Sequence, residues 1–298
     1  MATGAGADRA PMSGEPVRSR GGGRAVANWL RNYPLAPHYR GAEAVTLRSA
    51  DEVRLAAWWL PGPPDAPAAA VLAHGALHHA RNPRILAFAE LLAVGVPVLV
   101  PDLRGHGRSG GRTSLGGEEP LDVAAAVAWV TARTGLPVVS IGLSLGGAAV
   151  LLAAGRYGGV VGAVALSAPA FTEFERPGAA RLHRLATTRT GRVVSAAVLG
   201  TRIAAQLARI EDAAHDVASI APAWVVLVHD PEDQYFGPEH PEAIRASARG
   251  PAEIWWEPGA GHGTDLLDAP LAGRILDLIR ARARPLSGDG PAAPPAAP

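Results

Sequence analysis

The stretch Pro137–Gly147, PVVSIGLSLGG, constrains this chain more than any other. Its first half is rich in β-branched residues, which is typical of a buried strand, and an apolar, alanine-rich run that suits a helix follows it. Between the two lies Gly142–Gly146, a glycine-x-serine-x-glycine turn. Such a turn holds its serine on a sharp bend at the carboxyl edge of a sheet. Ser144 is therefore a candidate nucleophile, and the N–H of Leu145, at the start of the helix, is a candidate donor to an oxyanion.

Segments typical of strands alternate with segments typical of helices along most of the chain. This alternation predicts an α/β fold with a mainly parallel sheet of about eight strands and helices on both faces. The first two strands flank a polar turn and are expected to form a hairpin. We expect strands at 45–48, 53–60, 68–73, 96–100, 138–141, 160–166, 224–228 and 253–256, and helices at 85–94, 120–134, 239–248 and 266–283.

One region breaks the alternation. Residues 168–221 contain no convincing strand and are expected to form a helical cap, with helices at 178–189 and 193–210. The ends of the chain are rich in glycine, alanine and proline, so 1–23 and 285–298 are expected to be disordered tails around a domain at 24–284.

Composition excludes several classes of function. The formal net charge is +1, which does not favour nucleic acid or an anionic membrane as a partner. Cysteine is absent, so disulfides, a thiol nucleophile and thiolate metal sites are excluded, and the absence of lysine excludes a Schiff-base or P-loop lysine. No secretory signal or membrane span is recognisable, and we expect a cytoplasmic protein.

Four motifs occur in an order that resembles the α/β-hydrolase superfamily, over about residues 42–283. His74-Gly75 closes the third strand, and the run DLRGHGRS at 102–109 closes the fourth. The serine turn closes the fifth strand, and His262 lies in a glycine-rich loop after the last one. The chain is similar to the serine-hydrolase branch with a small helical cap. This resemblance implies an α/β-hydrolase fold and a site built on Ser144.

The resemblance also implies partners for the serine. A serine hydroxyl needs an adjacent base, and His262 stands where the family keeps that histidine. An acid must orient the imidazole, and the motif His229–Asp233 follows the seventh strand. The family pattern puts the acid at Asp233. Asp230, which directly follows the strand, stays open as the alternative.

An oxyanion site needs a second N–H donor besides Leu145. The family pattern suggests Ala76, in the loop after the third strand, with Leu77 as the alternative. The adjacent His78-His79 is expected to lie in a solvent-exposed loop.

Other conspicuous residues are interpreted as structural. His74, His106 and His229 are expected to hold loops together by hydrogen bonds, and Asp102 to anchor its own glycine-rich loop. In the cap, Phe171, Phe174 and Leu182 are candidates either for an acyl pocket or for the core of the cap itself.

Together these features predict a serine hydrolase that cleaves a small carboxylic ester, or a thioester or amide, through an acyl-enzyme. No cofactor or metal is implied, and the expected partner is a small acyl substrate. A cofactor-free perhydrolase with the same triad and a non-catalytic binding protein with this fold remain alternatives. The sequence carries no sign of the oligomeric state.

Overall fold

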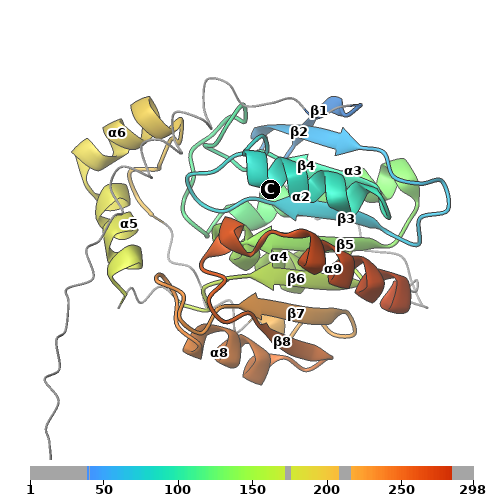
Figure 1. The fold of residues 1–298 in the computed structure, drawn as a ribbon. Helices are drawn as coiled ribbons and strands as arrows, with labels where there is room; N and C mark the ends of the chain where they lie inside the picture. Colours follow the sequence, from blue (N-terminus) through green and yellow to red (C-terminus); the bar gives the residue numbers. More distant parts are fainter. Residues whose placement is uncertain (1–38, 40, 172–175, 208–215, 284–298) are drawn as a thin grey trace, which may run out of the picture.

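The computed structural model describes residues 39, 41–171, 176–207 and 216–283. Its strands are β1 (Glu43–Arg48), β2 (Arg54–Leu60), β3 (Ala69–Ala73), β4 (Val98–Pro101), β5 (Val138–Leu143), β6 (Gly162–Leu166), β7 (Trp224–His229) and β8 (Ala252–Trp256). In this part of the chain they form one eight-stranded sheet in the order β1-β2-β4-β3-β5-β6-β7-β8 (Figure 1). β1 and β2 form the expected antiparallel hairpin, and β2 is also antiparallel to β4. The pairs from β4 to β8 are parallel, which confirms the predicted mainly parallel sheet.

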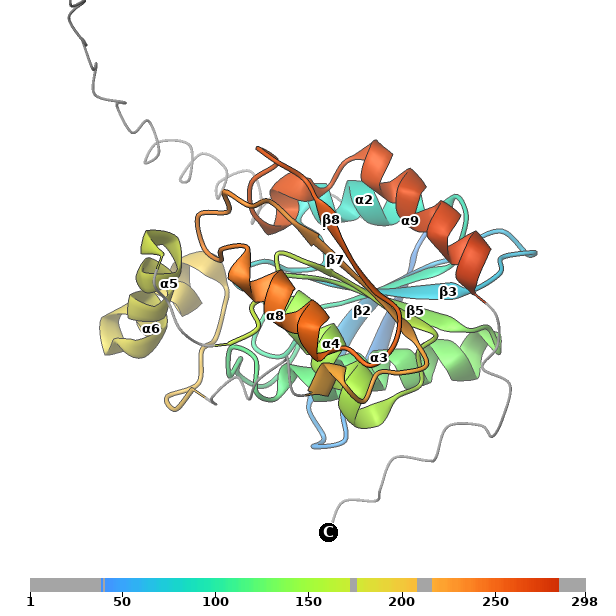
Figure 2. The same cartoon turned by 90° about the horizontal axis from the view of Figure 1, so that it is seen from below.

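Helices cover both faces of this sheet. They are α2 (Pro83–Ala93), α3 (Glu119–Thr134), α4 (Leu145–Tyr157), α8 (Glu239–Ser247) and α9 (Ala269–Arg282), with a short 3₁₀ helix, η1 (Gly263–Leu266). Figures 1 and 2 show α2 and α9 on one face and α3, α4 and α8 on the other. Each face has its own apolar core, and the central strands β3 to β7 are buried on both.

Two adjacent tryptophans on β2, Trp58 and Trp59, are buried on opposite faces of the sheet. Trp58 packs into the core under α2 and α9, whereas Trp59 packs into the core under α3 and α4. Strand alternation does send the two side chains to opposite faces, but helices cover both faces, so both rings are buried.

Two helices stand beyond the carboxyl edge of the sheet, α5 (Pro177–Thr187) and α6 (Arg189–Leu199) (Figures 1 and 2). The helix predicted at 193–210 ends earlier than predicted, because Gly200 adopts a left-handed conformation that ends α6 at Leu199. The chain then runs back to the sheet domain, where Ile203 forms a β-bridge with Thr113. The helix before it is also shorter than predicted, since Thr188 is extended and caps α6 with its hydroxyl.

Several expectations lie outside the described residues. These are the disordered tails at 1–23 and 285–298 and the role of Phe174. Within the described ranges, no helix is both long and apolar enough to cross a membrane.

Candidate active site

Ser144 lies on the bend between β5 and α4. Its φ of 51° and ψ of −114° are strained for a residue with a side chain. The bend closes only because its flanking residues have no side chain. A Cβ on Gly142 would lie 2.1 Å from the carbonyl oxygen of Gly146, and a Cβ on Gly146 would lie 2.5 Å from that of Ala73. The sequence pattern is thus a steric requirement of the turn that exposes the Ser144 hydroxyl.

Three residues far apart in the sequence meet at this bend. His262 Nε2 lies 3.0 Å from Ser144 Oγ, and His262 Nδ1 lies 2.6 Å from Asp233 Oδ2. An ionised carboxylate only accepts hydrogen bonds, so the proton is on Nδ1 and Nε2 is free to accept from the serine hydroxyl. The arrangement can therefore move a proton from Ser144 to His262 while Asp233 stabilises the resulting imidazolium.

Asp233 is fully buried, and its second oxygen accepts from the N–H groups of Tyr235, at 2.7 Å, and Phe236, at 3.3 Å. Burial by itself raises the pKa of Asp233. The hydrogen bond and charge of His262 and the N–H of Tyr235 outweigh that effect, so the net shift of the pKa of Asp233 is downward. The carboxylate form that His262 requires is thereby stabilised.

Asp230, the alternative acid, has a different set of contacts. Its Oδ1 accepts from the N–H of Glu232 at 2.9 Å, and its Oδ2 accepts from the N–H of Gly261 at 2.7 Å. Both oxygens of Asp230 are thus engaged by backbone, and Asp233 is the carboxylate in contact with His262.

Sequence reasoning missed a residue that holds the other side of the His262 loop. Ser167 directly follows β6, and its hydroxyl accepts from the N–H of Gly263 at 3.1 Å. The loop is thus anchored on both sides of His262, through Gly261 and Gly263. A signal that could have found Ser167 is its place directly after β6, because β6 pairs with β5, the strand that leads to Ser144.

The loop after β3 supplies backbone N–H groups close to Ser144, because β3 is the neighbour of β5. The two candidate donors on this loop differ. The N–H of Leu77 points to His106 and donates to its Nε2 at 3.3 Å. On the other side, Leu145 is the first residue of α4, and the N–H groups of a first helical turn have no intrahelical acceptor. Within the part of the chain that the structure describes, these contacts do not engage the N–H groups of Ala76 and Leu145, which stay candidate donors to an oxyanion.

The residues interpreted as structural make the expected contacts. His74 donates from Nδ1 to the carbonyl of Gly75, and its Nε2 accepts from the N–H of Leu103 at 3.0 Å. Asp102 accepts from the N–H groups of Ala80 and Arg108, which joins the loops after β3 and β4. These loop predictions are confirmed. They show how the fold holds the loop after β3 in place.

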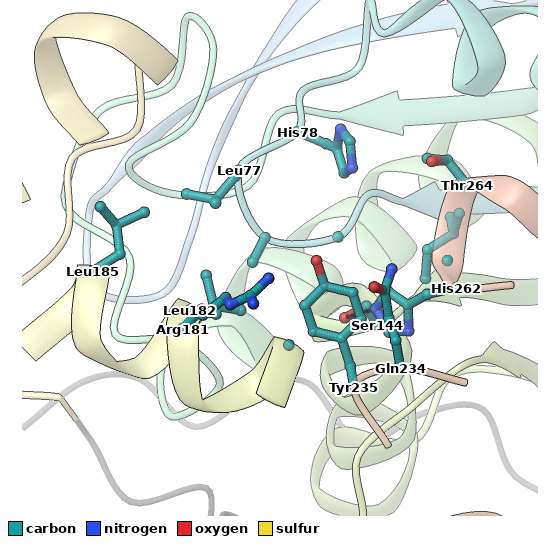
Figure 3. Close-up of a pocket in the computed structure, with 15 residues that line it drawn as sticks. Leu77, His78, Ser144, Arg181, Leu182, Leu185, Gln234, Tyr235, His262 and Thr264 are labelled. Carbon is teal, nitrogen blue, oxygen red and sulfur yellow. Dashed lines mark hydrogen bonds between the residues drawn. The ribbon is translucent and has the colours of Figure 1, made fainter. Parts of the chain in front are cut away.

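A cavity of about 380 Å³ opens above Ser144, which is in the range of small-molecule sites. Figure 3 shows Tyr235 beside His262 at its floor and His78 on the opposite wall. The expectation of a solvent-exposed loop at His78-His79 is wrong, because His79 is buried and His78 lines the cavity. Burial, with the nearby His79, lowers the pKa of His78 to about 4, so this wall is uncharged at neutral pH. Among the described residues, no group of three or more potential ligands could hold a metal ion.

Helix α5 forms one side of the cavity. Leu182 lines it, as one of the alternatives predicts, together with Leu185 (Figure 3). Phe171 does not line it. Its ring stacks on His240 of α8 at a centroid distance of 4.2 Å and packs against the core of the sheet domain. For this residue both alternatives, the acyl pocket and the core of the cap, are therefore wrong.

The fold and the serine bend define the class of protein: this is an α/β-hydrolase. Solved esterases share the fold. The esterase Pf2001 of Pyrococcus furiosus is 20% identical, with a TM-score of 0.65 over 82% of this chain and 93% of that one. The esterase domain of a Rhodothermus marinus protein is 24% identical, with a TM-score of 0.55 over 80% and 96%. A putative aryl esterase from Burkholderia cenocepacia is 20% identical, with a TM-score of 0.58 over 80% and 99%.

Within this class, residues 64–224 match the family model described as serine aminopeptidase, S33. The match covers more than half of the chain, and the chain belongs to this family. A search of curated protein sequences finds no match.

Proposed function

We propose that this protein is a serine hydrolase that cleaves a carboxylic ester through an acyl-enzyme on Ser144, with His262 and Asp233 completing a catalytic triad. One observation carries the proposal. The His262 imidazole bridges Ser144 Oγ, at 3.0 Å, and Asp233 Oδ2, at 2.6 Å, at the floor of a cavity large enough for a small ester.

The proposed reaction has two halves. Ser144 Oγ attacks the ester carbonyl while His262 Nε2 takes its proton, and the N–H groups of Leu145 and Ala76 stabilise the oxyanion. His262 then gives that proton to the leaving alkoxide, and the alcohol departs. Water attacks the acyl-enzyme by the same route, with His262 again as the base, and releases the acid and free Ser144.

The cavity supports an ester rather than an aminopeptidase substrate. An aminopeptidase has to bind the cationic amino terminus of a peptide, and a carboxylate serves that purpose. None of the described residues that line the cavity is acidic, and one of them, Arg181, is cationic. A cationic amino terminus would be repelled there.

The helical insertion α5–α6 is proposed to act as a cap over the acyl site, because α5 supplies Leu182 and Leu185 to the cavity wall. Perhydrolysis by the same triad and binding without catalysis remain the alternatives. Both give outcomes that differ in the test below.

The test is a panel of p-nitrophenyl esters of increasing acyl length, with wild type and Ser144→Ala compared. We expect wild type to release p-nitrophenol with a preference for short acyl groups. Ser144→Ala should lose several orders of magnitude in kcat, by analogy with other triads. A folded wild-type protein with no turnover supports the binding protein. An oxidation that needs hydrogen peroxide and outpaces hydrolysis supports the perhydrolase.

A further inference from the structure

One face of α5 points into the cavity. Gly178, Arg181, Leu182 and Leu185 all line it, and their spacing of three and four residues places them on the same side of the helix. Gly178 lets this face approach closely, since a Cβ there would lie 2.8 Å from the carbonyl oxygen of Gln234. Figure 3 shows the Arg181 side chain extending from α5 toward Tyr235. Arg181 thus lies on the face of α5 that contacts the loop after β7, which carries the proposed acid Asp233.

Arg181 sets the charge of the cavity. Among the described residues that line it, Arg181 is the one side chain with a permanent charge. Tyr235 is neutral, because burial and the nearby Asp233 and Asp265 raise its pKa, an effect that the charge of Arg181 opposes. The electrostatic interaction between Arg181 and the Tyr235 hydroxyl agrees with their proximity in Figure 3.

The nearby carboxylates are already engaged. Asp233 is bound to His262 and to the backbone, and Asp265 forms an ion pair with Arg84 at 2.5 Å. The described insertion, residues 176–207, carries no acidic residue at all. Within the described ranges, Arg181 forms no ion pair or hydrogen bond, and its side chain is exposed to solvent. A ligand therefore does not have to displace a described partner to reach it.

We propose that Arg181 is a specificity-determining residue, and that the substrate is an ester with an anionic group, such as a carboxylate, placed to meet its guanidinium while the scissile carbonyl lies at Ser144. This inference rests on the proposed hydrolase function and names the substrate class. A guanidinium presents paired N–H donors that match the two oxygens of a carboxylate, so it favours such an anion over a neutral group of the same shape.

The anion can belong to the acyl part or to the alcohol, and matched pairs of esters separate these two sources. The acyl pair is the p-nitrophenyl monoester of adipic acid and that of its monoamide. The alcohol pair is the butyrate ester of 3-hydroxybenzoate and that of 3-hydroxybenzamide. In each pair a carboxylate is replaced by an uncharged carboxamide, and kcat/KM is measured for wild type, Arg181→Gln and Arg184→Gln. Arg184 is the control, since it lies exposed on the same helix, carries the same charge and does not line the cavity.

We expect wild type to prefer the carboxylate in at least one pair, which identifies the part of the substrate that carries the anion. Arg181→Gln should lower that carboxylate-to-carboxamide ratio by roughly five- to tenfold, and Arg184→Gln should keep it. The wild-type ratio should also fall as the NaCl concentration rises, because salt screens an exposed ion pair.

Three results would overturn the proposal: no carboxylate preference in either pair, a ratio that Arg181→Gln leaves intact, or equal losses in both variants. The hydrolase function is judged separately. A wild type that hydrolyses the carboxamide esters without any anion preference rejects the role of Arg181 alone, whereas a wild type that hydrolyses none of the four rejects the function.

Discussion

At the scale of single residues, the position of His262 depends on its neighbours. Gly261 and Gly263 flank it, with φ of 89° and 57°, and glycine backbone is free to adopt many conformations. Asp230 and Ser167 accept hydrogen bonds from the N–H groups of Gly261 and Gly263, and these bonds restrict the conformation of the loop. We propose that they are positioning residues, which act on Ser144 through His262.

The two aspartates can be separated by substitution. Asp233→Asn keeps the shape but offers an amide to His262 Nδ1, which favours the wrong tautomer, and a loss of up to ~10⁴ in kcat is expected by analogy with a known triad. Asp230→Asn should cost far less, because an amide oxygen can still accept from Gly261. Both variants are assayed at one pH on a p-nitrophenyl ester, with folding checked by circular dichroism. A large loss in Asp230→Asn together with a mild one in Asp233→Asn would assign the acid to the end of β7 instead.

At the scale of elements, α5 and the loop after β7 contact each other, and both line the cavity. The Arg176 guanidinium donates to the carbonyl oxygen of Asp233, and Gly178 lies against Gln234 and the ring of Tyr235. These contacts tie the insertion to the loop that carries the proposed acid. A change in the position of α5 is therefore expected to alter substrate preference.

Gly178→Ala tests this contact. The new Cβ would lie 2.8 Å from the carbonyl oxygen of Gln234, so α5 or the loop has to move. We expect a destabilisation of about 1–3 kcal/mol, the usual range for overpacking, and a changed acyl-length profile on p-nitrophenyl esters. An unchanged profile and an unchanged free energy of unfolding would show that the contact is not as close as described.

Gly273→Ala is the matched control on another helix. Gly273 is an exposed position inside α9, and a Cβ there meets no atom within 4 Å. Alanine has the higher helix propensity, so this variant should be more stable by about 0.5–1 kcal/mol in urea denaturation, with the wild-type acyl profile. A loss of stability would mean that α9 packs more tightly around Gly273 than the structure has it.

At the scale of the whole molecule, buried histidines should make the fold sensitive to acid. His240 is buried against Phe171, and its Nδ1 accepts from the N–H of Ala170 at 3.0 Å. Burial lowers the pKa of His240 to about 4. Below about pH 6.5 the unfolded chain therefore binds a proton that the folded chain does not, and stability falls as the pH drops from about 6.5 toward 4.

His240→Gln removes this contribution. Its free energy of unfolding should fall less than that of wild type between about pH 7 and pH 4.5, by an amount of the order of 2 kcal/mol. Urea denaturation at a series of pH values measures the slope, which is independent of any packing loss at pH 7. Equal slopes in the two proteins would mean that the pKa of His240 is the same in the folded and the unfolded chain.

The arrangement of the whole molecule could be predicted from the sequence only in part. The alternation of strands and helices was sufficient for the layers and for a mainly parallel sheet, whose strands end together at one edge. The choice of His262 and Asp233 as partners of Ser144 came from the resemblance to the α/β-hydrolase superfamily. Neither was sufficient for contacts made by loops. The anchoring of Gly263 by Ser167 and the burial of His79 depend on how separate loops fold over one another, which no local pattern encodes.

The central claim is that His262, held by Asp233, activates Ser144. Covalent labelling tests it directly, because a fluorophosphonate forms a phosphorus–oxygen bond with an activated serine and releases fluoride. The probe is applied to native wild type, to heat-unfolded wild type and to Ser144→Ala, and the labelled peptide is identified by mass spectrometry. We predict one adduct, on Ser144, in the native wild type alone. An adduct on another residue, or equal labelling of Ser144→Ala, would contradict the account.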